Sequence, residues 1–110
     1  MLGKYPYVRS RKLLDSSRGQ ICTLNFHGCD YGTETTVACH AGFDFCGKGA
    51  GVKASDLYSV DGCHNCHAIL DGRKNSEYTQ EHKDWFFWRA LVKTMNRRVE
   101  EGLIKVEGTK

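Results

Sequence analysis

The sequence predicts a small α+β domain stabilised by a metal ion, on three observations. Leucine, isoleucine, valine and phenylalanine supply 23 of the 110 residues, which is little material for a hydrophobic core. The chain also carries six cysteines and five histidines, and both residue types bind metals. Short strand-like segments precede one long segment of helical period. Because small domains with lean cores usually need an additional stabilising element, we expect the cysteines to hold zinc.

The N-terminal part is predicted to begin as a flexible basic tail over residues 1–9. Ser10 can cap a short helix over residues 11–17, which Gly19 would end. Residues 20–26 alternate between apolar and polar side chains, as a half-buried strand does. A helix followed by a strand is therefore expected here.

The middle of the chain contains most of the metal-binding residue types. Residues 27–32 have the composition of a turn, and residues 35–40 form a second predicted strand because they are rich in β-branched side chains. Residues 41–55 are rich in glycine and predict a long mobile loop. A short helix is expected to start within residues 63–67 and to end before Gly72.

The C-terminal part contains the main helix, predicted over residues 79–101. Thr79 can cap its start and Gly102 can terminate it. Residues 103–106 predict a short terminal strand. No repeat and no second domain is visible, so residues 10–110 are expected to form a single domain.

One face of the main helix carries a regular apolar stripe. Its members recur at steps of three and four, and they are Trp85, Trp88, Val92, Met95 and Val99, widened by Phe87 and Leu91. The first interpretation is that this stripe packs on the sheet and the metal site. The alternative is that the helix, over residues 85–99, forms a homodimer contact.

Composition excludes some classes of protein and leaves others open. The longest apolar stretch is far shorter than the ~18 residues that span a membrane, and the start of the chain has no apolar signal-peptide core. We therefore expect a cytoplasmic protein whose cysteines bind metal. The net charge is only +3, but residues 1–20 hold five basic side chains and one acidic side chain. This basic arm suits a polyanion, although a solvated tail would have the same composition.

The clearest local motif is the pair Cys63-x-x-Cys66, whose spacing suits one tetrahedral zinc ion. Cys22 and Cys29 are the expected partner pair, with His27 as an alternative to one of them. Six residues separate these two cysteines, which is more than the usual spacing. Buried free thiols, or disulfides in an oxidising compartment, are the competing interpretations.

Several short motifs follow one another in a set order. They are Arg18-Gly19-Gln20-x-Cys22, Gly28-Cys29, Glu34-Thr35-Thr36-Val37-x-x-His40, Lys53-x-Ser55-Asp56-Leu57, Cys63-x-x-Cys66-His67, Asp71-x-Arg73 and Glu101-Gly102-Leu103-Ile104. Over residues 10–107 the set resembles the family of small phage and prophage proteins assigned as nucleases and typified by YbcO. The layout is also similar to recombination endonuclease VII and to zinc-containing HNH nucleases of the His-Me finger class. The resemblance implies a ββα-metal fold, here with an added C-terminal helix and terminal strand, around a structural zinc.

The resemblance also implies an activity and its residues. The chain would be a phage DNA endonuclease of the bacterial host cytoplasm, serving recombination or DNA processing, with one divalent metal (magnesium, manganese or zinc). His40 would be the general base, since an imidazole titrates near neutral pH. His67 would ligate the catalytic metal, with Cys39 as a second ligand. Asp56 stands where the HNH pattern usually has asparagine, and it would position the base, contact the metal or simply cap a turn.

Basic residues outside the main helix are candidates for binding DNA through its backbone phosphates. They are Arg11, Lys12, Arg18, Lys48, Lys53, Arg73 and Lys74. Each would otherwise be an ordinary surface charge. Two alternatives remain open: a catalytically altered zinc-bound nucleic-acid-binding or assembly protein on the same fold, and a structural zinc protein that binds another protein through its aromatic helix.

Overall fold

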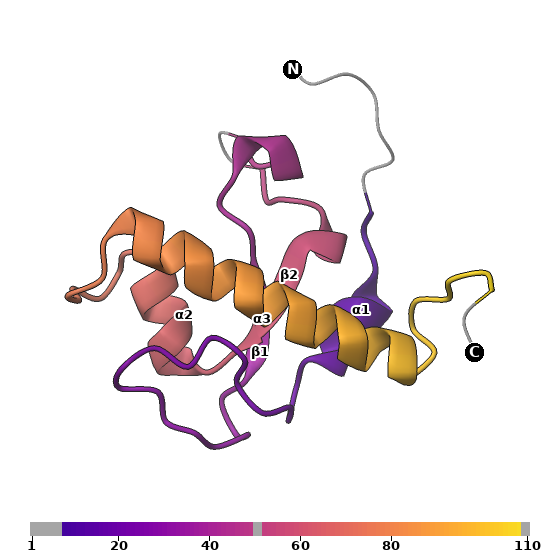
Figure 1. Ribbon diagram of the computed structural model, residues 1–110, viewed down its shortest axis with the longest axis horizontal. Coiled ribbons are helices and arrows are strands. Elements are labelled where there is room, and N and C mark those ends of the chain that lie inside the picture. Colours follow the sequence, from indigo (N-terminus) through magenta and orange to yellow (C-terminus); the bar gives the residue numbers. More distant parts are fainter. Residues whose placement is uncertain (1–7, 50–51, 109–110) are drawn as a thin grey trace.

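The computed structural model describes residues 8–49 and 52–108, and its helices surround a small sheet (Figure 1). The elements in chain order are α1 (Arg11–Ser16), β1 (Val37–His40), the 3-10 turn η1 (Asp44–Cys46), the 3-10 turn η2 (Asp56–Tyr58), β2 (Ser59–Gly62), α2 (His64–Leu70) and α3 (Gln80–Glu100). The predicted α+β class with a long C-terminal helix is confirmed. No helix in the described part of the chain is long and apolar enough to cross a bilayer.

The sheet consists of β1 and β2, which pair antiparallel with His40 opposite Ser59 and Val37 opposite Gly62. The helix α2 starts two residues after β2, so two strands and a helix follow one another around the sheet. In Figure 1, α3 crosses in front of the two strands, and α1 and α2 lie near its opposite ends. The fold therefore leaves the side of the sheet away from α3 available for a site.

The predicted helix ends are confirmed at the level of individual hydrogen bonds. The Ser10 hydroxyl accepts from the Leu13 N–H at 3.2 Å, and the Thr79 hydroxyl accepts from the His82 N–H at 3.1 Å. At the end of α3, Gly102 has a φ of 74°, and the Leu103 N–H donates to the Arg98 carbonyl at 2.9 Å. These contacts satisfy backbone groups that a helix end leaves without partners.

Two predicted strands are absent. Residues 20–26 do bury alternate side chains, because Cys22, Leu24 and Phe26 all lie in the core. They form no strand, however, since Asn25 adopts a φ of 54° and breaks the extended backbone. Residues 103–106 also form no strand; no second strand pairs with them in the described chain.

The predicted buried face of α3 is wrong for its central residues. Trp85, Trp88 and Val92 are 59%, 67% and 53% exposed, whereas the buried residues of the helix are Phe87, Ala90, Thr94 and Arg98. Phe87 and Leu91, which widened the predicted stripe, do pack on the core. Two of the four buried residues are polar, and a hydrophobicity pattern assigns such residues to the surface. The homodimer contact through residues 85–99 stays a prediction.

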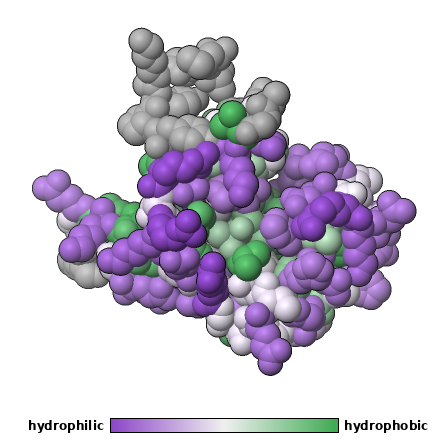
Figure 2. Space-filling model, turned by 180° about the vertical axis from the view of Figure 1, so that it is seen from behind, coloured by the Kyte–Doolittle hydropathy of each residue, from purple (hydrophilic) through white to green (hydrophobic). Residues whose placement is uncertain are grey.

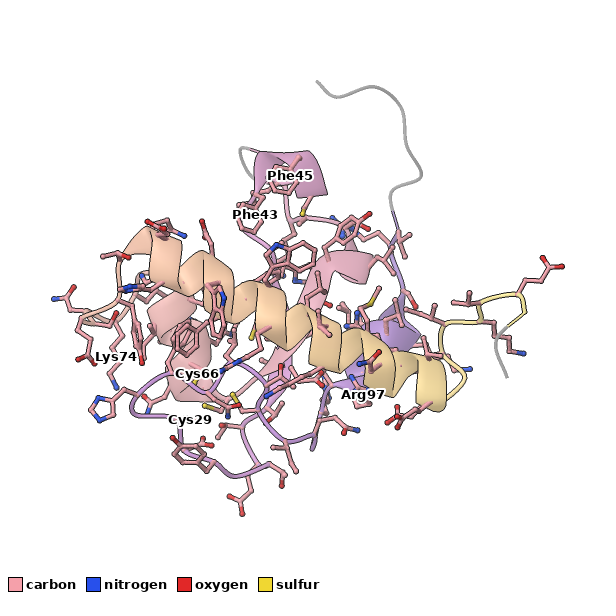
Figure 3. All side chains as sticks on the ribbon, in the orientation of Figure 1. Cys29, Phe43, Phe45, Cys66, Lys74 and Arg97 are labelled. Carbon is pink, nitrogen blue, oxygen red and sulfur yellow. The ribbon has the colours of Figure 1, made fainter. Side chains whose placement is uncertain are left out.

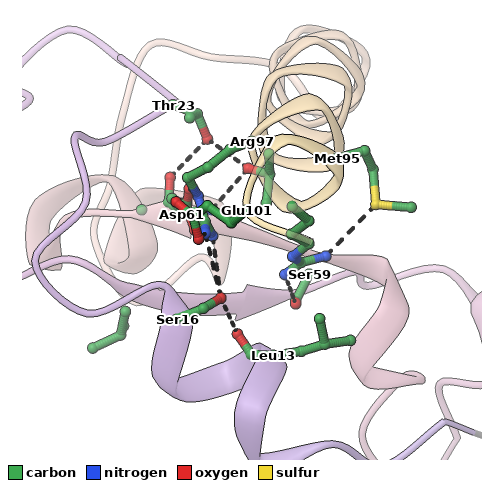
Figure 4. Close-up of polar contacts among 12 residues, drawn as sticks. Leu13, Ser16, Thr23, Ser59, Asp61, Met95, Arg97 and Glu101 are labelled. Carbon is green, nitrogen blue, oxygen red and sulfur yellow. Dashed lines mark hydrogen bonds and ion pairs between the residues drawn. The ribbon is translucent and has the colours of Figure 1, made fainter. Parts of the chain in front are cut away.

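The polar residues of α3 are buried because β2 provides partners for them (Figure 4). The Arg97 guanidinium donates to both carboxylate oxygens of Asp61, at 2.8 and 2.9 Å. Arg98 donates to the Ser59 hydroxyl at 2.8 Å, and the Thr94 hydroxyl accepts from the Asp61 N–H at 3.2 Å. Polar contacts as well as apolar packing therefore fix α3 on the sheet.

The predicted flexible tail, residues 1–9, lies mostly outside the described residues. Its last two residues are held in place: the Val8 carbonyl accepts from the Asp56 N–H at 2.9 Å, and Arg9 donates to the carbonyls of Lys53 and Ala54. This contact joins the start of the described chain to the segment before β2.

Candidate metal centre and active-site cleft

Four cysteines from distant parts of the chain meet in one cluster. Cys22, Cys29, Cys63 and Cys66 are all buried, and their Sγ atoms lie within 4.8 Å of one another. Figure 3 shows Cys29 and Cys66 close together beside α2 and α3. The four predicted zinc ligands are thus brought together, whereas the alternative ligand, His27, is 85% exposed at its side chain and pairs with Glu77.

The geometry of the cluster fits zinc. A tetrahedral site with Zn–S bonds of about 2.3 Å places its sulfur atoms about 3.8 Å apart. The Sγ atoms of Cys29 and Cys63 are 3.8 Å apart. Four thiolates are a donor set that suits zinc, so these residues would hold it as a closed structural site.

Backbone and side-chain donors already point at the sulfur atoms. The Cys66 N–H donates to Cys63 Sγ and the Tyr31 N–H donates to Cys29 Sγ, both at 3.4 Å. A hydrogen bond from Cys66 lowers the pKa of Cys22 to about 5, whereas burial raises the pKa of Cys29 to about 11. Donors of this kind stabilise the thiolate form, which is the form that binds metal.

A second group of polar side chains surrounds Asp56. Its carboxylate accepts from His40 Nε2 at 2.8 Å, from Arg9 Nη1 at 3.0 Å and from the Ser10 N–H at 2.7 Å. The Asp56 side chain is 4% exposed, so these three donors meet a nearly buried carboxylate. Burial acts to raise the pKa of Asp56, but the hydrogen bonds from His40 and Ser10 and the charge of Arg9 outweigh it, and the pKa is lowered.

An ionised Asp56 determines which nitrogen of His40 carries a proton. A carboxylate only accepts hydrogen bonds, so His40 Nε2 must donate to it. In the neutral imidazole, the lone pair is then on Nδ1. The His40 side chain is 16% exposed, and the residue lines an open cleft.

The cleft has a volume of about 1030 Å³ and is formed by α1, β1, the loop after β1, α2 and the start of α3. Both His40 and His67 line it. His67 lies on α2, with its Nε2 3.2 Å from an oxygen of Asp71. Burial lowers the pKa of His67, while the charge of Asp71 acts in the opposite direction. The two histidines predicted to act together therefore face one cavity.

Basic side chains outnumber acidic ones in the lining of this cleft, where Asp15, Asp71 and Asp84 also lie. Of the seven basic residues predicted to bind nucleic acid, five line it: Arg11, Arg18, Lys48, Lys53 and Arg73. Lys12 and Lys74 do not, and Lys74 donates instead to the Asn65 side chain at 2.9 Å. Viewed from the side opposite α3, the molecule has hydrophobic surface at its centre with hydrophilic residues around it (Figure 2).

Cys39 is the predicted ligand of the catalytic metal that the structure does not bring to the cleft. Successive side chains of a strand point to opposite faces, so Cys39 and His40 cannot share one side of β1. The Cys39 side chain is fully buried in the core with Leu24 and Val60, and burial raises the pKa of its thiol. It therefore packs the core and is too far inside to be a ligand in the open cleft.

Two residues of the site were not identified from the sequence. Asp71 lies four residues after His67 on the same helix, and that spacing was an available signal. Arg9, which contacts Asp56 across 47 positions, had no local signal. Among the described residues, the four cysteines are the only group of three or more metal-binding side chains close enough to share an ion.

The protein is a small α+β protein with a cluster of four cysteines. Its two-stranded sheet is followed by a helix, and a cleft with several basic side chains lies beside the sheet. The model of the family described as "Putative nuclease YbcO" matches residues 11–103. Because this match spans most of the chain, the chain belongs to that family.

A solved structure supports the fold. It is described as "Structure of a putative bacteriophage protein from Escherichia coli str. K-12 substr. MG1655", and it matches with a TM-score of 0.64 at 23% identity. The match covers 81% of this chain and 98% of that chain. No curated protein matches the sequence.

Proposed function

We propose that this protein is a metal-dependent DNA endonuclease in which His40 is the general base. The observation that carries the proposal is the His40–Asp56 pair, with a separation of 2.8 Å, at the edge of a cleft lined by basic residues. Asp56 holds the Nε2 proton, so the Nδ1 lone pair can accept a proton from an attacking water. The family description as a nuclease agrees with this chemistry.

His67 is the proposed protein ligand of a catalytic divalent metal. A bound metal would neutralise charge on the scissile phosphate and on the leaving oxygen. The donor set fits a hard or borderline cation, because the His67 imidazole lies beside the Asp71 carboxylate, at side-chain exposures of 28% and 39%. Few protein ligands suffice for such an ion, since magnesium usually keeps several waters.

The four-cysteine cluster is proposed to bind a structural zinc and to take no part in hydrolysis. Cys63 and Cys66 flank the start of α2, and His67 follows Cys66 directly. The zinc would therefore fix the direction in which His67 faces the cleft.

DNA is the proposed partner, bound through its backbone phosphates by the basic residues of the cleft. The similar solved structure is described as a bacteriophage protein, and a role in phage DNA processing follows that likeness. The competing function is nucleic-acid binding without catalysis on the same fold. It is favoured by one observation: apart from the cysteines, no group of three metal-binding side chains is preassembled in the described chain.

Cleavage assays separate the two functions. Zinc-loaded protein is incubated with duplex, single-stranded and branched DNA in the presence of magnesium, manganese or zinc. His40→Ala is expected to lower the cleavage rate by about 10²- to 10⁴-fold, the usual contribution of a positioned base. His67→Ala should lose activity that higher metal concentrations partly restore, whereas the loss in His40→Ala should persist.

The matched control is His64→Ala. His64 lies between Cys63 and Cys66, close in sequence to His67, but its side chain is exposed and does not line the cleft. It should cut as fast as wild type. A His40→Ala variant that cuts at the wild-type rate would refute the assigned base. If wild type cuts no DNA with any metal but binds it, the binding function replaces the endonuclease.

A further inference from the structure

Two aromatic rings project from the loop that follows His40. Phe43 and Phe45 are stacked, with ring centroids 4.9 Å apart and planes inclined by 15°. Phe43 is half-buried and contacts Phe87 of α3 edge-on at 6.1 Å, so it is anchored to the core. Phe45 is 57% exposed, and Figure 3 shows both rings on a projection beyond α3.

Phe45 adjoins the cleft through its neighbour. Phe43, on which the Phe45 ring stacks, lines the cleft together with His40, Lys48 and Lys53. Both lysines are exposed. An exposed apolar ring is common on protein surfaces. An exposed ring that is stacked on a fixed neighbour, which itself shares a cleft with two lysines, is a more specific arrangement.

This arrangement matches the two chemical parts of a nucleotide. A flat ring with an open face accepts a stacked base, and lysines beside it attract the adjoining phosphates. In a duplex, the faces of internal bases are covered by their neighbours and cannot reach such a ring. Only an unpaired segment presents free base faces.

We propose that Phe45 is a base-stacking platform that gives the cleft a preference for single-stranded nucleic acid. The inference rests on the proposed function and specifies its substrate class. The unpaired strand would enter the cleft past Phe45, with a base on the ring and phosphates near Lys48 and Lys53. Selection would then depend on strand state and little on sequence, because every base has a face that stacks.

Binding measured without cleavage tests this platform independently of the catalytic function. Zinc-loaded protein is titrated, without added catalytic metal, with three fluorescent probes: a single-stranded oligonucleotide, the same sequence as a duplex, and an abasic strand of equal length. Phe45→Ala is expected to weaken single-strand binding by about tenfold. Binding of the duplex and the abasic strand should change by less than about twofold, because neither offers a free base face.

Replacements at the same position separate stacking from general hydrophobicity. Phe45→Leu keeps apolar bulk without an aromatic face and should bind single strands as weakly as Phe45→Ala. Phe45→Trp should retain wild-type affinity. The control is Trp85→Ala, since Trp85 is 59% exposed but neither lines the cleft nor contacts a ring that lines it, and it should leave single-strand binding unchanged.

Three results would overturn the platform: an equal loss of affinity for all three probes, wild-type affinity in Phe45→Leu, or no loss in Phe45→Ala. The titrations contain no catalytic metal and measure binding alone. A failure of cleavage therefore leaves the binding result interpretable, and the two proposals can fail separately.

Discussion

The ion pair between Arg97 and Asp61 gives the most quantitative test of how α3 is held. The Asp61 side chain is 1% exposed and that of Arg97 is 14% exposed, and two hydrogen bonds of 2.8 and 2.9 Å join them. Arg97→Met keeps a long apolar side chain but leaves a buried carboxylate without its cation. Removing one partner of such a pair costs about 3–5 kcal/mol, and we expect a loss of this size.

The second variant, Arg97→Met with Asp61→Asn, distinguishes lost charge balance from lost packing. It removes the buried charge and leaves an amide with unmet hydrogen bonds, which costs about 1–3 kcal/mol. The double variant should therefore be more stable than Arg97→Met alone. The control is Glu101→Gln, because Glu101 also bonds Arg97 but is 41% exposed, and surface pairs contribute at most about 1 kcal/mol.

Urea unfolding of zinc-loaded protein measures all four proteins, and equal slopes against urea would validate the comparison. The reasoning is refuted if Arg97→Met lies within about 0.5 kcal/mol of wild type, which is the range of ordinary surface substitutions. It is refuted equally if the double variant is no more stable than the single one.

Three further predictions concern the cysteine cluster, the core and the exposed face of α3. Cys66→Ser should lose bound zinc, measured by mass spectrometry, and should no longer fold cooperatively, because such sites contribute on the order of 10 kcal/mol of folding free energy. The control Cys46→Ser should keep its zinc. A Cys66→Ser protein that is folded and free of zinc would contradict this prediction. Gly62→Ala should cost about 1–3 kcal/mol in urea unfolding, because a Cβ there would lie 2.7 Å from Cys39 Sγ. Adding Cys39→Ala should recover part of that cost, and an undiminished cost would contradict the packing role of Cys39. Trp85, Trp88 and Val92 form an exposed apolar face, and we expect the wild-type protein to pair through it and to sediment as a dimer in analytical ultracentrifugation. Trp88→Glu should sediment as a monomer, and a monomeric wild type would contradict this prediction.

Features with a local signal could be predicted from the sequence. The Cys63-x-x-Cys66 spacing identified half of the cluster. Ser10 and Thr79 marked helix starts because their hydroxyls can cap a helix, and Gly102 marked a helix end because glycine tolerates a positive φ. Each depends on neighbours within a few positions. The sequence pattern carries that information directly.

Features that depend on distant partners could not be predicted. Thr94 and Arg98 read as surface residues, and they are buried only because β2 supplies hydrogen-bond partners. Residues 20–26 bury alternate side chains without forming a strand, since periodicity reports burial and not strand pairing. Arg9 was assigned to a flexible tail, although it lies 3.0 Å from Asp56.

The alternation of side chains along β1 explains how so small a domain combines a core with a cleft. Cys39 points inward and packs against Leu24, and Gly62 of β2, which pairs with Val37, has no side chain, which leaves room for the sulfur. His40 therefore points to the other face, where Asp56 meets it. Two cysteines of the cluster, Cys63 and Cys66, lie at the start of α2, and His67 follows the second of them. The hydrogen bond from His40 to Asp56 orients one histidine, and the cysteines at the start of α2 orient the other, His67. Loss of zinc should therefore disturb the cleft as well as the fold.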